Sequence, residues 1–395
     1  MPGNTAQAAV LLSVFLMSIV HCGHSEEGVC TKSDDGVKCS EDNSVRLTRL
    51  NGELVGNVQT IMDGDRKLEM KTLNMKPLVF EIENFLTEEE CDYIKAAAVK
   101  TGLESSQTMA HSMSKNQNVD LMDLNHDGEL DIKEMKITIE NGYDIFLEKE
   151  DILDMYSTLE LDTNGDTHIS REELSKIKPK DLFTYLHKVV ADHPEKHSRY
   201  SSQAWLDWDK VEDEVYERIQ ERTAKVTQMP IELIRLSDVQ VVRYGIDGHY
   251  NAHTDSSPLD EHVPCCMEGN RRKCRICRYM TILFYLNDVT EGGETAFPYA
   301  NMEDINETDA HLSEKLHLFK NCEQASLRVA ARRGKAIIWY NHFVNEETGW
   351  MGEVDEFTMH GGCPIKQGEK WIANIWVKTT DSKEADIANM RALHS

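Results

Sequence analysis

Residues 239–258 read VQVVRYGIDGHYNAHTDSSP and contain the motif His253-Thr254-Asp255, on which the interpretation of the whole chain depends. In an extended strand, residues i and i+2 point to the same face, so His253 and Asp255 would aim an imidazole and a carboxylate at one point. A single H-x-D is more often a surface turn than a pair of metal ligands. The stretch FTMHGGCPIKQGEKWIANIW at residues 357–376 adds a second histidine, His360, far downstream. The three residues together predict a metal site.

Two histidines and one carboxylate, with the other coordination positions open, form the ligand set of non-haem iron(II) oxygenases. A keto acid can occupy two of the open positions and dioxygen the third. Lys370 follows His360 closely, and a buried lysine needs a negative partner such as the far carboxylate of a dicarboxylic keto acid. On composition alone, a solvated lysine is the commoner case. Strand tyrosines beside the site are either hydroxyl donors to the co-substrate or packing residues: Tyr244, Tyr250 and Tyr285.

The composition is that of a soluble globular protein. The chain has 395 residues, enough for two domains or for one large domain with an insertion. Its net charge of −26 argues against nucleic acid as a partner, because phosphate binding needs clustered Lys and Arg. An acidic excess is instead typical of cation binding, of a basic partner, or of solubility alone.

The N-terminus carries a targeting segment, because residues 8–20 (AAVLLSVFLMSIV) form an apolar run. The run has the length of a signal-peptide core and is shorter than the roughly 20 residues of a membrane span. Residues 1–23 are therefore either a signal peptide or a signal anchor, and both deliver the rest of the chain to the secretory lumen. The sequon at Asn306 agrees with that location.

Ten cysteines also suit an oxidising compartment. Cys265, Cys266, Cys274 and Cys277 form a cluster for which disulfides are favoured over a zinc site. Cys30 and Cys39 are candidates for a further disulfide that closes a short loop. The sequence does not determine how the cluster pairs.

An insert with chemistry of its own follows the first predicted helix. Residues 123–134 match the EF-hand calcium loop at every position, with glycine at the sixth. A second loop at 162–173 has Thr167 at its sixth position, where a left-handed turn is costly, so its calcium affinity is the weaker expectation. The predicted calcium ligands are Asp123, Asn125, Asp127, Glu129, Asp131 and Glu134 in the first loop, and Asp162, Asn164, Asp166, His168, Ser170 and Glu173 in the second.

Outside this insert, short apolar strands separated by turns indicate an antiparallel barrel or jelly roll. Thr87 and Glu90 form a capping box that predicts a helix after a strand at residues 77–82. The fold class expected is α+β. The expected organisation is a targeting segment (1–23), a linker with a β element (24–75), the start of the main domain (76–110), the calcium-binding insert (111–195), the catalytic core (196–385) and a C-terminal tail (386–395).

Three segments resemble the catalytic core of the prolyl 4-hydroxylases: RYGIDGHYNAHTD (243–255), RYMTILFYLNDVTEGGETAFP (278–298) and HGGCPIKQGEKWIANIW (360–376). The EF-hand insert after FEIENFLTEEEC (80–91) and the apolar N-terminus narrow the resemblance to the transmembrane branch of that family in the endoplasmic reticulum. The resemblance extends over about residues 45–385.

The resemblance implies a double-stranded β-helix (jelly-roll) domain with flanking helices that uses iron(II), 2-oxoglutarate, dioxygen and ascorbate. It implies iron ligation by His253, Asp255 and His360, and binding of the C5 carboxylate of 2-oxoglutarate by Lys370. Supporting contacts would come from Tyr244, Tyr285 and Thr295, with Tyr250 nearer the substrate.

The function implied is hydroxylation of proline C4 in a protein substrate, in the lumen of the endoplasmic reticulum. No helical peptide-binding domain of the procollagen enzymes is visible towards the N-terminus, which favours a hypoxia-inducible-factor-type or unidentified protein over collagen. The alternative is an inactive luminal calcium-binding or scaffold protein on the same fold.

Overall fold

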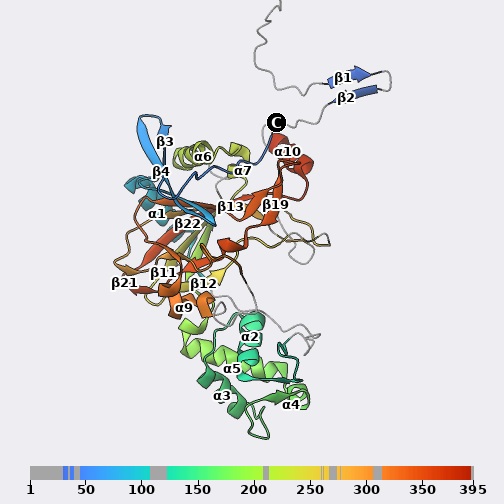
Figure 1. Cartoon of the computed structure of the whole chain (residues 1–395). Helices are drawn as coiled ribbons and strands as arrows, with labels where there is room; N and C mark the ends of the chain where they lie inside the picture. The colour runs from blue at the N-terminus through green and yellow to red at the C-terminus, as the bar shows by residue number, and fades with distance from the viewer. Residues whose placement is uncertain are drawn as a thin grey trace, which may run out of the picture. The chain divides into compact units, whose positions relative to one another are not determined.

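The chain is described by a computed structural model (Figure 1) that divides into two units, residues 1–45 and 46–395. It describes residues 30–33, 36–39, 45–106, 122–207, 213–258, 260, 262–266, 274, 275, 277–305 and 314–392. In the first unit, strand β1 (Cys30–Ser33) pairs antiparallel with β2 (Gly36–Cys39), and Cys30 lies opposite Cys39 in the register. The expected targeting segment, residues 1–23, lies outside the described residues.

The second unit is built on two antiparallel sheets. Among the described residues the larger sheet has nine strands, in the order β3-β4-β5-β17-β13-β22-β11-β10-β6. Its strands are β3 (Val58–Asp63), β4 (Arg66–Met75), β5 (Leu78–Ile82), β6 (Glu104–Ser105), β10 (Ser202–Leu206), β11 (Val239–Tyr244), β13 (Arg278–Tyr285), β17 (Ala336–Tyr340) and β22 (Lys370–Lys378). The β element expected before residue 76 is therefore part of this main sheet.

The smaller sheet has five strands within the described residues, in the order β16-β15-β20-β12-β9. These are β9 (Arg199–Tyr200), β12 (His249–His253), β15 (Thr295–Phe297), β16 (Leu327–Val329) and β20 (His360–Gly362). Three short two-stranded pairs complete the strands of this unit: β7 (Glu129–Leu130) with β8 (Ile169–Ser170), β14 (Glu291–Gly292) with β21 (Ile365–Gln367), and β18 (His342–Val344) with β19 (Met351–Val354).

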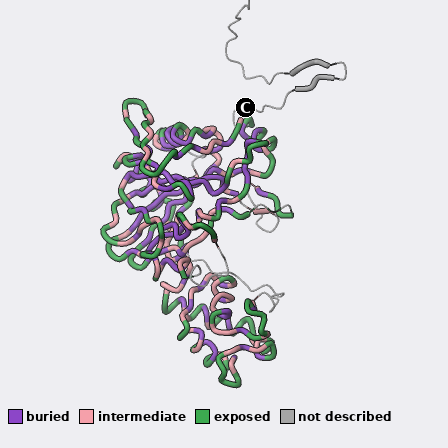
Figure 2. The backbone as a smooth tube through the Cα atoms, in the orientation of Figure 1, coloured by how far each residue is buried: buried purple, intermediate pink, exposed green. Residues whose placement is uncertain are grey.

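The hydrophobic core lies between these two sheets. Leu283, Ile337 and Ile372 of the larger sheet pack with Phe297 and Val329 of the smaller one, and all five are buried. The strands β13, β17 and β22 are buried along nearly their whole length, which explains why their sequences are almost continuously apolar (Figure 2). This arrangement confirms the jelly-roll domain expected from the sequence.

Helices cover the other face of the larger sheet. Helix α1 (Glu88–Thr101) contacts β10 and β11, and α7 (Ile231–Arg235) contacts both β22 and α6 (Glu214–Thr227). The capping box predicted for α1 is present, because the Thr87 hydroxyl accepts from the backbone N–H of Glu90 and the Glu90 carboxylate accepts from that of Thr87. The short helix α9 (Leu318–Asn321) packs on β12.

The insert has its own helices and its own core. Figure 1 shows α2 (Ile132–Tyr143), α3 (Lys149–Thr158), α4 (Arg171–Lys176) and α5 (Pro179–Asp192) gathered in one group. Their buried residues, among them Ile139, Ile152 and Leu186, form a cluster separate from the core between the sheets. The 3₁₀ turn η2 (Pro194–Lys196) returns the chain to β9.

The described part of the C-terminal half contains a helix near its end and three disulfides. Residues up to 392 of the segment expected as a C-terminal tail (386–395) belong to helix α10 (Lys383–Ala392), which buries Asp386, Ile387 and Met390. The cysteine cluster forms the disulfides Cys265–Cys277 and Cys266–Cys274, as favoured over zinc. A third disulfide, Cys322–Cys363, was not anticipated. Among the described helices, none is both apolar enough and long enough to cross a membrane.

Candidate metal and co-substrate site

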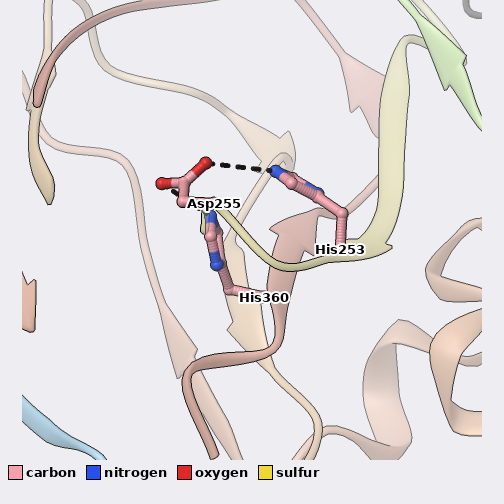
Figure 3. A group of neighbouring side chains, drawn as sticks. All are labelled: His253, Asp255 and His360. Carbon is pink, nitrogen blue, oxygen red and sulfur yellow. Dashed lines mark ion pairs between the residues drawn. The ribbon is translucent and has the colours of Figure 1, made fainter. Parts of the chain in front are cut away.

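Strand pairing in the smaller sheet brings the three predicted metal ligands together (Figure 3). His253 ends β12 and lies opposite His360, the first residue of β20. Asp255 lies just past the end of β12, in a bend rather than in the strand, and its carboxylate turns back towards both rings. The distance from Asp255 Oδ1 to His253 Nε2 is 3.8 Å, and that from Oδ2 to His360 Nε2 is 3.6 Å. The three ligand atoms therefore converge on one point, within 4.8 Å of one another.

Backbone carbonyls orient both imidazoles. Nδ1 of His253 lies 3.1 Å from the carbonyl oxygen of Asn251, and Nδ1 of His360 lies 2.8 Å from that of Thr358. A carbonyl only accepts, so each Nδ1 carries the proton and each Nε2 presents its lone pair to the common point. Burial, together with the nearby His360, lowers the pKa of His253 to about 3, and burial also lowers the pKa of His360. Both rings are thus held in the neutral form that binds a metal.

The carboxylate of Asp255 is held by residues of the larger sheet. Oδ2 accepts hydrogen bonds from the Thr281 hydroxyl at 2.7 Å and from the Trp376 indole N–H at 3.0 Å. Oδ1 lies 3.4 Å from the Arg278 guanidinium, which is itself 3.8 Å from the centre of the Trp376 ring. Burial acts to raise the pKa of Asp255, but its interactions with His360, Arg278 and His253 and the Thr281 hydrogen bond bring it below its ordinary value. Asp255 is therefore fixed in place and ionised.

Lys370 begins β22 and is almost completely buried, at 2% exposure. Its Nζ lies 3.5 Å from the Thr295 hydroxyl, which accepts a 2.8 Å hydrogen bond from Tyr285, and 5.6 Å from the ring centres of both Tyr244 and Tyr285. Within the described part of the chain, no carboxylate forms an ion pair with Lys370. Burial lowers the pKa of Lys370 to about 7, although Glu294 acts in the opposite direction. A buried ammonium without an anionic partner is a site prepared for an anion.

A single cavity of about 460 Å³ joins the two parts of the site. It is lined by all three predicted metal ligands and by Lys370, Thr295 and Tyr250, among others. The ring of Tyr250 stacks on that of His253, with centroids 3.6 Å apart. The structure thus places Tyr250 at the metal ligands, whereas Tyr244, Tyr285 and Thr295 surround Lys370.

The chain matches a family model for the 2OG-Fe(II) oxygenase superfamily over residues 239–378, which include every residue of the site described so far. It is 36% identical over 361 residues to the transmembrane prolyl 4-hydroxylases of Mus musculus and Homo sapiens, covering 85% of this chain and 70% of each relative. This chain belongs to the prolyl 4-hydroxylase family. The viral collagen prolyl hydroxylase of Paramecium bursaria Chlorella virus-1, solved with 2OG, shares 20% identity and aligns with 76% of this chain and 96% of its own, at a TM-score of 0.38.

This prolyl 4-hydroxylase family member uses side chains at its site that the sequence did not single out. Thr281, Trp376 and Arg278 contact Asp255 but come from β13 and β22, and nothing in their local sequence indicates a contact with Asp255. The alternation Lys370, Ile372, Asn374, Trp376 along β22 was the available signal, because every second residue of a strand faces the same side. All four line the cavity.

The calcium loops predicted in this family member have similar backbone conformations. Gly128 at position six of the first loop has φ +93°, and Thr167 at the same position of the second has φ +68°, which is costly for a residue with a Cβ. Loop N–H groups donate to Asp123 in the first loop and to Asp162 in the second. The carboxylates of Glu134 and Glu173 accept from backbone N–H groups of their own loops. The two loops are joined through the β7–β8 pair, as in an EF-hand lobe.

Among the described residues, only two groups of three or more His, Cys, Asp or Glu side chains bring their ligand atoms within 4.8 Å of one another. One is the triad. The other is Glu294 with Cys322 and Cys363, whose sulfurs are joined in a disulfide. The described calcium-loop residues form no such group, and Glu134 and Glu173 accept hydrogen bonds from the backbone of their loops. The predicted glycosylation site Asn306 lies outside the described residues.

Proposed function

We propose that this chain hydroxylates C4 of proline residues in a protein substrate, with iron(II), 2-oxoglutarate and dioxygen. The observation that carries the proposal is that the triad His253, Asp255, His360 shares one cavity with Lys370, a buried lysine for which the described residues supply no carboxylate partner. Two neutral imidazoles and one ionised carboxylate suit a ferrous ion and leave positions open for the co-substrate and dioxygen. When bound, the iron would activate dioxygen at the expense of the keto acid, which loses CO₂ and becomes succinate.

The side chains have separate tasks in this proposal. Lys370 would pair with the C5 carboxylate of 2-oxoglutarate and so orient its keto-acid end towards the metal ligands. Tyr285 and Thr295 form a hydrogen-bonded pair beside the Lys370 ammonium, and the centre of the Tyr244 ring lies 5.6 Å from Nζ. Gly361 keeps β20 close to β12, since a Cβ there would lie 2.3 Å from the carbonyl oxygen of Tyr250. Ascorbate is proposed as the reductant that restores ferrous iron after unproductive cycles.

The test is the release of labelled CO₂ from 2-oxoglutarate labelled at C1, together with mass spectrometry of the peptide. Hypoxia-inducible-factor-type and collagen-type proline peptides form the first panel, and the sequence favours the former. We expect peptide-dependent CO₂ release and the gain of one oxygen on proline, both abolished by His360→Ala. If the iron-loaded wild type releases no more CO₂ than His360→Ala with any peptide, the proposal is wrong and the chain is an inactive scaffold.

We further propose that both loops of the insert bind calcium, the first more tightly than the second. The proposal rests on the oxygen side chains at the loop positions, the left-handed turn at position six and the pairing of the loops through β7 and β8. Thr167 strains the turn of the second loop by about 1–2 kcal/mol relative to glycine, which lowers its affinity. The insert has its own hydrophobic core. Bound calcium would stabilise the insert by bringing together the several carboxylates of each loop.

Calcium titration followed by thermal unfolding tests this second proposal. We expect calcium to raise the melting temperature, and Glu134→Gln to weaken the response more than Glu173→Gln, because the first loop carries the stronger site. Thr167→Gly should strengthen calcium binding to the second loop. An unfolding transition that does not move with calcium, in wild type and Thr167→Gly alike, contradicts the proposal.

We propose the lumen of the endoplasmic reticulum as the location, with the N-terminal segment as membrane anchor or signal peptide. The three disulfides of the described residues support an oxidising compartment, and the mammalian relatives are named as transmembrane proteins. Protease protection and glycosidase shift at Asn306 in microsomes are the measurements. A chain that is protease-sensitive in intact microsomes and carries no glycan contradicts this location.

A further inference from the structure

Arg199 is a second buried cation in the cavity, and the described residues supply no anionic partner for it. It lies on β9, opposite Tyr250 of β12 in the strand register, and is 8% exposed. Its Nε donates a 3.0 Å hydrogen bond to the Ser201 hydroxyl, and its guanidinium carbon lies 4.8 Å from the centre of the Tyr250 ring. No carboxylate of the described residues forms an ion pair with it, although it lines the same cavity as the metal ligands.

The charges that line the cavity explain why this arginine is available. Three of the lining side chains are permanently or potentially cationic in addition to the histidines: Arg199, Arg278 and Lys370. Asp255 is the one carboxylate among the described lining residues, and Arg278 and the metal both require it. Lys370 takes the distal carboxylate of the co-substrate in the proposed function. The charge of Arg199 is left without compensation in a chain whose net charge is −26.

Burying a guanidinium without a counter-ion is costly, so an anion is the ligand that gains most from reaching it. A peptide carbonyl can accept a hydrogen bond from Arg199 but cannot neutralise its charge. The planar guanidinium also matches a carboxylate through two parallel N–H donors. These considerations favour an acidic side chain over the main chain of a substrate as the partner of Arg199.

The position of Arg199 relates this partner to the reacting residue. One aromatic ring, that of Tyr250, separates the guanidinium from the metal ligand His253, because Tyr250 stacks on the His253 imidazole. An extended peptide advances about 3.3–3.6 Å per residue, so a side chain that reaches Arg199 belongs within about three residues of the target proline. Arg199 is thus placed to select the sequence around the proline rather than to take part in the reaction.

We propose that Arg199 determines substrate specificity by pairing with an Asp or Glu side chain close to the target proline. The inference rests on the proposed function, since it names the class of peptide that the same cavity accepts. Ser201 holds Nε, and the Tyr250 ring supports the guanidinium face, so the two terminal nitrogens remain for the carboxylate.

The experiment uses the full chain loaded with iron(II) and 2-oxoglutarate. The probes are Ala/Gly peptides with one proline, in which a single Asp or Asn is moved through about three positions on each side of it. Binding is measured by calorimetry without oxygen, and oxygen gain on proline by mass spectrometry in air. At one or two positions we expect the Asp peptide to bind about tenfold or more tightly than its Asn twin, because charged hydrogen bonds are the strong ones.

Arg199→Gln should abolish this difference by weakening only the Asp peptide, whereas Arg199→Lys should keep part of it. Arg218→Gln, which removes the same charge from the exposed surface of α6, is the matched control and should retain the full Asp preference. Equal binding of Asp and Asn peptides at every position, or a preference that persists in Arg199→Gln, overturns the inference. Oxygen gain without an Asp preference leaves the proposed function standing and refutes the role of Arg199. An Arg199-dependent preference without oxygen gain supports that role and refutes the proposed function.

Discussion

Replacing Trp376 by phenylalanine tests how the larger sheet supports the metal site. The substitution removes the indole N–H that donates to Asp255 Oδ2 at 3.0 Å but keeps an aromatic face beside the Arg278 guanidinium. A hydrogen bond to a charged group contributes about 1.5–3 kcal/mol, and loss of a partner of a metal ligand costs about 10–100-fold in metal affinity. Thr281 still donates to the same oxygen, so we expect the lower half of that range, about 10–30-fold.

The assay is a calorimetric titration of the metal-free protein with iron(II) under nitrogen. Trp371→Phe is the matched control, because Trp371 lies on the same strand and stacks with Arg243 rather than with residues that line the cavity. It loses a similar volume without touching Asp255. If Trp376→Phe binds iron(II) as tightly as wild type, or if Trp371→Phe loses as much affinity, the hydrogen bond from the indole does not support the metal site.

Three further predictions concern Lys370 and Gly361 of strand β20. Lys370→Met should raise the KM for 2-oxoglutarate at least about 100-fold, because it removes a buried charged partner, and unchanged steady-state kinetics would exclude the pairing. Since the pKa of Lys370 in the free protein is about 7, the co-substrate must recharge it at higher pH. The affinity for 2-oxoglutarate, measured by anaerobic calorimetry, should fall by up to about tenfold per pH unit above pH 7. In Lys370→Arg, whose charge does not titrate, the affinity should not change with pH. If the affinity falls equally steeply with pH in both proteins, a group other than Lys370 is responsible. Gly361→Ala should destabilise the protein by about 1–3 kcal/mol in denaturant unfolding, because its Cβ would meet the Tyr250 carbonyl, whereas Gly245→Ala has open space and should be nearly neutral.

The three residues of the candidate metal site could be singled out from the sequence because each carries a local signal. His253 and Asp255 are spaced for one side of an extended segment, and His360 lies in a second polar motif flanked by glycines. The detail that failed is the extended backbone at Asp255, which lies in a bend after β12. The carboxylate still meets the imidazoles because Thr281 and Trp376 hold it from the other sheet.

The residues that sequence reasoning missed reach the site only because of the order in which the strands pair. Thr281 on β13 and Trp376 on β22 are adjacent because these two strands pair, with Thr281 opposite Trp376 in the register. Strand order across a nine-stranded sheet is set by long-range packing, which local patterns do not encode. Arg199 was overlooked for the same reason, since it becomes part of the site when β9 pairs with β12. Helix α10 did carry a signal, because Asp386, Ile387 and Met390 have the three- and four-residue spacing of a helix face.

The metal and co-substrate sites depend on both sheets, and this has an energetic consequence. The smaller sheet supplies His253 and His360, whereas the larger one supplies Lys370 and the hydrogen bonds that hold Asp255. Binding of iron and 2-oxoglutarate would therefore bridge the two sheets across the core that joins them. A ligand at 100 times its dissociation constant stabilises the folded state by about 2.7 kcal/mol. Mutations in the core between the sheets should consequently weaken metal binding as well as folding, because a change in sheet separation moves the histidines away from Asp255.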